Sequence, residues 1–227
     1  MNNKFDNLVV GGGIVGVSIA YHLSKTPSSK TILLEKNAIG SGATSMSAGT
    51  IAASMSFPNP KIFTPFLTFH TIKTIHEVEK SGFPTSWVNS GDYTFATNKA
   101  SLNYLKNMND FAKTNGLVSR WLDLDELTKT LPNISKSTKN NNGVLAATFN
   151  ELSGQVNPSV LVEAIAAAAT ENGAILREGE NVINIEKCGF LKKWFFGCDY
   201  EVETESGERY SENMNEMKIL NLDFRIL

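Results

Sequence analysis

The sequence predicts an α/β fold, and three features of its first thirty-five residues support that prediction. An apolar run at residues 8–10 is followed directly by Gly-Gly-Gly-Ile-Val-Gly at residues 11–16, which fits the pattern G-x-G-x-x-G. A helix is expected next, and a β-rich run at residues 31–34 then ends in Glu35. Glu35 stands nineteen positions after Gly16, close to the ~20 residues at which an acid reaches a ribose in such folds. This arrangement predicts a site for an adenine dinucleotide.

Each glycine of the turn has its own expected role. Gly11 permits the tight turn, Gly13 lets the backbone approach a pyrophosphate, and Gly16 lets the helix pack close to its strand. The helix, expected over about residues 14–24, would direct its N–H groups and the positive end of its dipole at the phosphates. Glu35 favours a free ribose over a ribose with a 2′-phosphate, because two negative charges would otherwise meet.

The composition limits the kind of protein and its partners. The chain has 227 residues, enough for one or two domains of ~100–200 residues each, and a net charge of −2. No segment gathers lysine and arginine on one face, which argues against a nucleic-acid partner. No apolar run reaches the ~18 residues of a membrane span and no leader peptide is visible, so we expect a cytoplasmic protein without a membrane span.

The cysteines and histidines give little indication of reactive chemistry. Cys188 and Cys198 flank an aromatic-rich segment that could form a hairpin, which makes a disulfide conceivable; without an export signal, we expect two free thiols. The histidines His22, His70 and His76 have no partners at metal-ligand spacing. We therefore expect no metal site and assign none of the three a catalytic role.

A run of small residues follows Glu35. Residues 38–51 read Ala-Ile-Gly-Ser-Gly-Ala-Thr-Ser-Met-Ser-Ala-Gly-Thr-Ile. Small side chains over a dozen positions indicate that something large lies close to the backbone. A flexible linker is the alternative, but linkers are usually more polar and lack the apolar residues that follow here.

Two later helices carry clear start signals. Asp123 followed by Glu126 is similar to a capping box and predicts a short helix through Leu131. Asn157 as N-cap and Pro158 at the first position start an alanine-rich helix. The other expected elements are helices at residues 65–80 and 102–112, the second closing at Asn115-Gly116, strands joined by a turn within residues 87–97, a surface loop at 135–142, and strands at 174–176, 182–185 and 200–204.

From Asn7 to about Gly207 the sequence resembles the FAD-dependent oxidoreductases of the D-amino-acid oxidase and glycine oxidase type, a family that includes sarcosine and dimethylglycine dehydrogenases. The glycine turn is shared with many dinucleotide enzymes, whereas the small-residue loop and the Asn157-Pro158 helix single out this family. The motifs that carry the resemblance are residues 11–16, 35–36, 42–44, 47–49, 91–93, 122–123 with Leu127 and Pro132, 156–158, 173–174 and Val182.

The resemblance implies a Rossmann-like FAD-binding domain of the GR2 type with an inserted α+β substrate domain. The FAD-binding domain is expected at residues 1–60 and 150–215, discontinuous and incomplete, with a partial substrate domain at 61–149. Family members continue well past the equivalent of Tyr210, whereas this sequence ends in an atypical tail at 211–227 with no glycine after Gly207. We therefore expect a C-terminally truncated chain.

The resemblance also implies FAD as the cofactor. It would be bound non-covalently, because Met46 and Ser47 stand where some relatives attach FAD through a histidine. The glycine turn would meet the pyrophosphate, the small-residue loop would line the flavin, and the backbone of Val182 would face the adenine. The expected cofactor-binding residues are Gly11, Gly13, Ile14, Val15, Gly16, Glu35, Lys36, Gly42, Ala43, Thr44, Ser47, Ala48, Gly49, Thr50 and Val182.

The implied reaction oxidises a small-molecule amino acid or a secondary or tertiary amine, with hydride passing from the substrate carbon to the flavin. No catalytic residue is assigned, because this chemistry needs no obligatory protein nucleophile. Asp92 and Tyr93 are polar residues of the expected substrate domain that could touch a ligand, although a Gly-Asp turn also explains them.

Two other functions fit part of the sequence. One is an inactive remnant that keeps the nucleotide-binding fold, which the missing C-terminal portion favours. The other is an NAD-dependent dehydrogenase, which leaves residues 38–51 and the Asn157-Pro158 helix unexplained. The substrate, the electron acceptor and the oligomeric state do not follow from the sequence.

Overall fold

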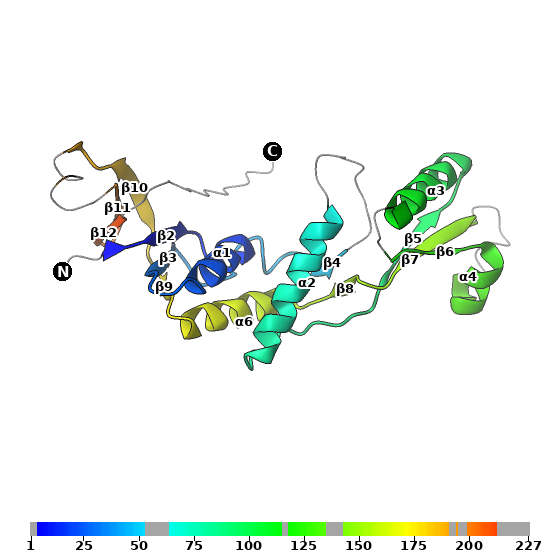
Figure 1. Ribbon diagram of the computed structural model, residues 1–227, viewed down its shortest axis with the longest axis horizontal. Helices are drawn as coiled ribbons and strands as arrows, with labels where there is room; N and C mark the ends of the chain where they lie inside the picture. The colour runs from blue at the N-terminus through cyan, green and yellow to red at the C-terminus, as the bar shows by residue number, and fades with distance from the viewer. Residues whose placement is uncertain are drawn as a thin grey trace. The chain divides into compact units, whose positions relative to one another are not determined.

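A computed structural model describes residues 4–52, 64–114, 118–134, 143–190, 194 and 199–212. The chain forms two compact units. Unit 1 comprises residues 1–48, 77–85 and 157–227, and unit 2 comprises residues 49–76 and 86–156. Figure 1 labels the elements of both units.

Unit 1 is built on a parallel sheet in the order β2-β3-β9, formed by β2 (Asn7–Val10), β3 (Thr31–Glu35) and β9 (Ile175–Glu178). The central strand is the most buried, with Ile32, Leu33 and Leu34 no more than 1% exposed. A strand covered on both faces needs a continuous apolar run, and the sequence of β3 provides one.

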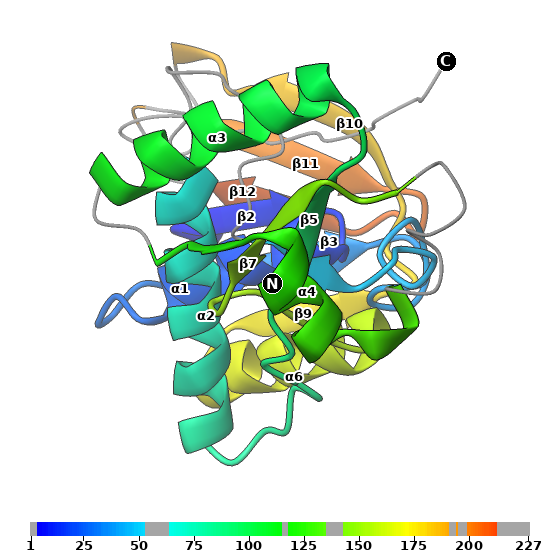
Figure 2. The same cartoon turned by 90° about the vertical axis from the view of Figure 1, so that its right-hand side faces the viewer.

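Two helices and a second sheet cover the parallel sheet of unit 1. Helices α1 (Ile14–Ser24) and α6 (Pro158–Glu171) pack against each other, and the small side chains of α6 allow a close approach. The second sheet has the order β1-β12-β11-β10, from β1 (Lys4–Phe5), β10 (Val182–Lys187), β11 (Tyr200–Thr204) and β12 (Arg209–Glu212). Figures 1 and 2 show α6 and β10–β12 on opposite sides of the parallel sheet. Ile32 and Leu34 of β3 pack with Val202 and Tyr210 of this second sheet.

Unit 2 contains an antiparallel sheet in the order β5-β7-β6, from β5 (Asp92–Ala96), β6 (Arg120–Leu122) and β7 (Ala146–Asn150). Helices α3 (Lys99–Thr114) and α4 (Leu124–Thr130) contact this sheet, and Leu127 of α4 packs with Leu122 and Ala147. A short ladder joins β4 (Thr50–Ile51) to β8 (Gly154–Gln155). Helix α2 (Thr64–Lys80) contributes residues to both units.

The predicted helices are confirmed, and their caps explain where they begin. The Asp123 side chain accepts a hydrogen bond from the Glu126 N–H at 2.9 Å at the start of α4. The Asn157 side chain accepts from the N–H groups of Ser159 and Val160 at 3.1 and 3.4 Å at the start of α6. The predicted closure at Asn115-Gly116 and the predicted loop at 135–142 lie outside the described residues.

The prediction of strands joined by a turn within residues 87–97 is wrong. Asp92 and Tyr93 lie inside one strand, β5, and Val88 forms only an isolated bridge with Gln155. Gly91 has a φ of +66°, and its N–H donates to the Ser153 carbonyl at 2.8 Å. This left-handed glycine leads the chain into β5, so the turn signal marks the start of a strand and not a hairpin.

The structure contains strands that the sequence did not predict. The added strands are short: β1, β4, β6, β7, β8 and β12, the last of which includes Ser211 and Glu212.

Cys188 is in a disulfide, so the expectation of free thiols is wrong for this residue. Its N–H donates to the Asp199 carbonyl at 2.9 Å, which draws the ends of the β10–β11 connection together. Cys198 lies outside the described residues.

Within the part of the chain that the structure describes, no helix has the length and apolar character needed to cross a membrane.

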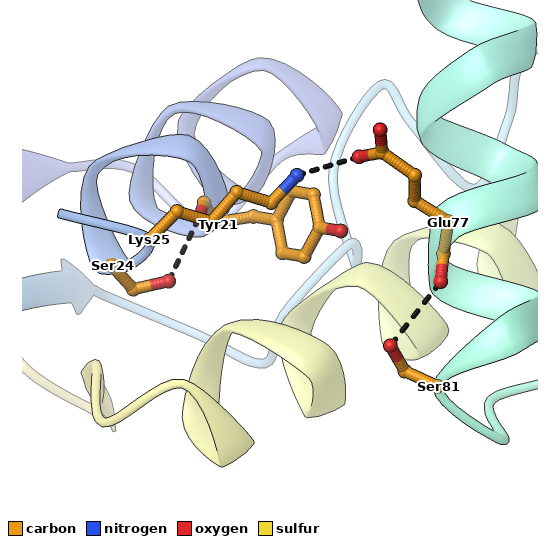
Figure 3. A network of polar contacts seen from close by, with 5 residues as sticks. All are labelled: Tyr21, Ser24, Lys25, Glu77 and Ser81. Atoms are coloured by element: carbon orange, nitrogen blue, oxygen red, sulfur yellow. Dashed lines mark hydrogen bonds and ion pairs between the residues drawn. The ribbon is translucent and has the colours of Figure 1, made fainter.

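An ion pair joins the end of α1 to the last turn of α2 within unit 1 (Figure 3). Lys25 Nζ lies 2.7 Å from Glu77 Oε2 and 4.1 Å from the centroid of the Tyr21 ring. Partial burial acts to lower the pKa of Lys25, but the hydrogen bonds with Glu77 and Tyr21 outweigh burial and raise it. Both charged side chains are more than a third exposed, so the pair fixes geometry more than it stabilises the fold.

Tyr210 makes the stability of unit 1 sensitive to alkaline pH. Burial raises the pKa of Tyr210, and the nearby charges of Glu180 and Glu208 raise it further. A folded-state pKa above the unfolded value of about 10 gives stability that is complete below pH ~10 and is lost as the pH rises through the folded-state pKa. We expect the free energy of unfolding, measured by urea titration, to fall less steeply above pH ~10 in Tyr210→Phe than in the wild type.

Tyr104→Phe is the matched control, because Tyr104 is 41% exposed on α3. It should keep the wild-type dependence on pH. An unchanged alkaline fall in Tyr210→Phe would contradict the assignment.

Candidate dinucleotide site

The turn between β2 and α1 is held in direct contact with the start of the helix. Gly11 has a φ of +103°, and its N–H donates to the Leu34 carbonyl at 2.8 Å. A Cβ on Gly16 would overlap the Gly11 carbonyl oxygen. Both positions therefore require glycine for the packing of the turn itself, before any ligand is considered.

Gly12 is a site residue that the sequence reasoning missed. Its N–H donates to Glu35 Oε2 at 2.6 Å, and its carbonyl accepts from the Gly40 N–H at 2.9 Å. A Cβ at this position would lie 2.6 Å from Ile39 Cδ1 and 2.9 Å from both Cβ and Cγ of Glu35. The signal in the sequence was the middle one of three consecutive glycines, at a position where the pattern G-x-G allows any residue.

The first turn of α1 takes its cap from a distant residue. Gly13 precedes the helix in an extended conformation and offers no side chain, so the Thr44 hydroxyl oxygen accepts from the Ile14 N–H at 3.0 Å. A Cβ on Gly13 would lie 3.3 Å from that oxygen. Thr44 thus satisfies one of the unpaired N–H groups at the start of α1, which is usually the role of an N-cap side chain. The same hydrogen bond fixes the small-residue loop to the helix. Val15, also in this first turn, is 47% exposed.

Glu35 connects the turn to the small-residue loop. One carboxylate oxygen accepts from Gly12, and the other accepts from the Asn37 N–H at 2.8 Å. A carboxylate has about four acceptor positions, so two remain for a ligand hydroxyl. Lys36 follows Glu35 and is exposed.

The small-residue loop is a series of turns closed by its own serines. The hydroxyls of Ser41, Ser45 and Ser47 donate to the carbonyls of Ala38, Gly42 and Thr44 at 2.7, 3.0 and 2.8 Å. These bonds fix the loop locally, which does not fit the alternative of a flexible linker. Gly42, Ala43, Ser47 and Ala48 are exposed, and Met46 is 81% exposed.

The last three residues of the loop, 49–51, belong to unit 2. The Gly49 carbonyl accepts from the Val156 N–H at 2.9 Å, and Thr50 begins β4.

Val182 belongs to unit 1 and stands two positions after Glu180, a residue that contacts β3 directly. It begins β10, and two residues earlier the Glu180 N–H donates to the Glu35 carbonyl at 2.9 Å. Its side chain packs on the cluster around Leu34 and Val202. The structure therefore brings Val182 and the glycine turn to the end of β3 from segments far apart in the chain.

Other candidate residues carry no clear chemistry. Tyr93 packs against Phe149, with ring centroids 4.6 Å apart, and is part of the core of unit 2. Asp92 has one buried carboxylate oxygen with no hydrogen-bond partner among the described residues. His22 and His70 contact neighbouring aromatic rings. Among the described residues, His, Cys, Asp and Glu form no group of three or more that could hold a metal ion.

Comparison with known proteins identifies what this arrangement is similar to. The model of the FAD-dependent oxidoreductase family matches residues 6–213. Glycine oxidase from Bacillus licheniformis is 30% identical over 190 residues, which are 82% of this chain and 48% of that protein. 4-Methylaminobutanoate oxidase (formaldehyde-forming) from Paenarthrobacter nicotinovorans is 30% identical over 185 residues, which are 81% of this chain and 21% of that protein.

The fold has close counterparts among solved structures. The crystal structure of glycine oxidase from Geobacillus kaustophilus superposes with a TM-score of 0.75 at 24% identity, over 93% of this chain and 54% of that one. The chain thus spans about half the length of the glycine oxidases that it matches.

The close packing at Gly12 predicts the effect of a single methyl group there. In Gly12→Ala the new Cβ would press on Cβ and Cγ of Glu35, which cannot move without disturbing the end of β3. We expect a loss of about 1–3 kcal/mol in the free energy of unfolding, measured by urea titration.

Gly42→Ala is the control, because no atom lies within 4 Å of a Cβ at Gly42 and its φ is not positive. Its stability should stay within about 1 kcal/mol of the wild type. Equal stability of Gly12→Ala and Gly42→Ala would show that the turn is packed more loosely at Gly12 than these distances indicate.

Proposed function

The chain belongs to the family of FAD-dependent oxidoreductases, and on that premise we propose that it binds FAD and serves the oxidation of an amino acid or a secondary or tertiary amine. The observation that supports this most is the start of α1, where a turn of three glycines meets an exposed loop of small side chains. Such a surface leaves room for a large planar group against the backbone.

We assign the pyrophosphate to the turn and to the first residues of α1. Anions are favoured at a helix N-terminus by its N–H groups and dipole. Gly13 has no side chain to cover this end of the helix. The Ile14 N–H already donates to the Thr44 hydroxyl oxygen. The residues proposed to hold the phosphates are Gly11, Gly13, Ile14, Val15 and Gly16.

We assign the adenosine portion to Glu35, Lys36 and the backbone of Val182. The Glu35 carboxylate is fixed by two backbone N–H groups, so its remaining acceptor positions have a defined direction. A fixed carboxylate would accept hydrogen bonds from ribose hydroxyls and would repel a phosphorylated ribose.

We assign the flavin portion to the small-residue loop. The proposed contacts are Gly42, Ala43, Thr44, Ser47, Ala48, Gly49 and Thr50. No histidine stands in the loop, and Met46 cannot form the covalent link that some relatives make, so FAD would be bound non-covalently. When bound, FAD supplies the acceptor for a hydride leaving the carbon next to the substrate nitrogen.

The names of the relatives support the substrate class. One is a glycine oxidase and the other a 4-methylaminobutanoate oxidase, and both names describe substrates with a nitrogen on an oxidisable carbon. The residues of this chain would bind and orient the cofactor, and none is assigned as an acid, a base or a nucleophile.

A branched side chain at Gly13 tests the phosphate assignment. Gly13→Val would place two methyl groups at the start of α1, where we assign the pyrophosphate. We expect FAD affinity, measured by quenching of flavin fluorescence on titration, to fall by at least about tenfold, which corresponds to ~1.4 kcal/mol.

Gly189→Val serves as the control, because no atom lies within 4 Å of a Cβ at Gly189 and the residue is in the β10–β11 connection. It should bind FAD as the wild type does. Undiminished FAD affinity in a folded Gly13→Val protein would show that the turn does not bind the pyrophosphate.

The substrate class is tested by anaerobic reduction of the flavin. Amino acids and N-methylated amines added to the FAD-loaded protein should bleach its visible absorption, whereas hydroxy acids without nitrogen should not. A loaded protein that no amine bleaches would favour the inactive alternative.

A further inference from the structure

Glu178 is a second carboxylate at the edge of the sheet where the cofactor site lies. It ends β9, and it is the register partner of Glu35 at the end of β3. Carboxyl ends of parallel strands meet at one edge of a sheet, so the two acids are neighbours. Like charges side by side repel each other, and the arrangement becomes favourable only if each carboxylate finds hydrogen-bond donors.

Glu178 finds its donor at the beginning of the small-residue loop. The Ile39 N–H donates to Glu178 Oε1 at 2.6 Å, a contact between residues 139 positions apart. The neighbouring Gly179 N–H donates to the Asn37 carbonyl at 3.3 Å. The end of β9 thus bonds to the loop at Ile39 and to Asn37, the residue just before the loop. Asn37 also donates its N–H to Glu35 at the end of β3.

The contact with Ile39 reaches the glycine turn. A Cβ on Gly12 would lie 2.6 Å from Ile39 Cδ1, so the Ile39 side chain lies against the turn. The next residue, Gly40, donates its N–H to the Gly12 carbonyl and packs on Val162 of α6. A shift of the Ile39 backbone would therefore move both the loop and the turn.

We propose that Glu178 is a positioning residue of the FAD site, which acts through the Ile39 N–H to hold the small-residue loop against the glycine turn. The proposal rests on the proposed function, because the loop and the turn are the assigned cofactor contacts. Glu178 itself touches neither the turn nor the part of the loop assigned to the flavin in any hydrogen bond that the structure shows for it.

Three variants separate this role from a general loss of charge. Glu178→Ala removes the acceptor, and Glu178→Gln keeps a side-chain oxygen of the same reach. Glu171→Ala removes one negative charge from an exposed residue at the end of α6, the helix that leads into the opposite end of β9. Two quantities are measured: FAD affinity by fluorescence quenching, and amide hydrogen exchange at Ile39 in the FAD-free protein.

We expect Glu178→Ala to bind FAD about three to ten times more weakly and to lose protection at the Ile39 amide. Glu178→Gln should recover most of both, and Glu171→Ala should match the wild type. A global loss of stability would lower protection throughout β3 as well, so protection lost at Ile39 but kept at Leu33 identifies the local role.

The outcomes that contradict the proposal are distinct from one another. If the wild type binds FAD and Glu178→Ala binds it equally well, the positioning role is overturned and the proposed function stands. Unchanged exchange at Ile39 in Glu178→Ala overturns the contact itself. A wild type that binds no FAD overturns the proposed function and, with it, the cofactor role of Glu178.

Discussion

The geometry of the candidate site depends on the Glu35 carboxylate, which accepts hydrogen bonds from two backbone N–H groups. This one side chain fixes Gly12 on one side and Asn37 on the other, so it sets the distance between the glycine turn and the loop. Glu35 can do so because it ends β3, the central strand, whose apolar residues are buried on both faces. The burial of Ile32, Leu33 and Leu34 thus stabilises the geometry at the strand end as well as the fold.

Segments far along the chain contact the loop that follows the first thirty-five residues and complete the candidate site. The loop after Glu35 contacts α6 through Gly40 and Val162, and it contacts β9 through Ile39 and Glu178. Both α6 and β9 follow unit 2 in the sequence. The part of the candidate site that lies in unit 1 therefore forms only when residues 1–48 and 157–227 have packed together.

Local signals predicted much of this structure, and tertiary contacts account for the rest. The glycine pattern, the Asn157 cap and the Asp123 cap each act within a few residues, so the sequence alone revealed the elements they start. Strands such as β4 and β8, of two residues each, are too short to show alternation and exist because of their partners. The family, inferred from motifs, is confirmed by a match that covers most of the chain.

The site shows the same division. Glu35 and the glycines at positions 11, 13 and 16 were recognisable from spacing. The close fit of Gly12, the capping of Ile14 by Thr44 and the contact of Glu178 with Ile39 join residues 23, 30 and 139 positions apart, and no local pattern encodes them. The assignment of these residues to FAD remains a prediction.

The first measurement to make is the visible absorption spectrum of the purified chain, recorded before and after acid precipitation. We expect a yellow protein that releases its flavin into the acid supernatant, as a non-covalent FAD site requires. A folded protein that carries no flavin and takes up none from added FAD would contradict this expectation.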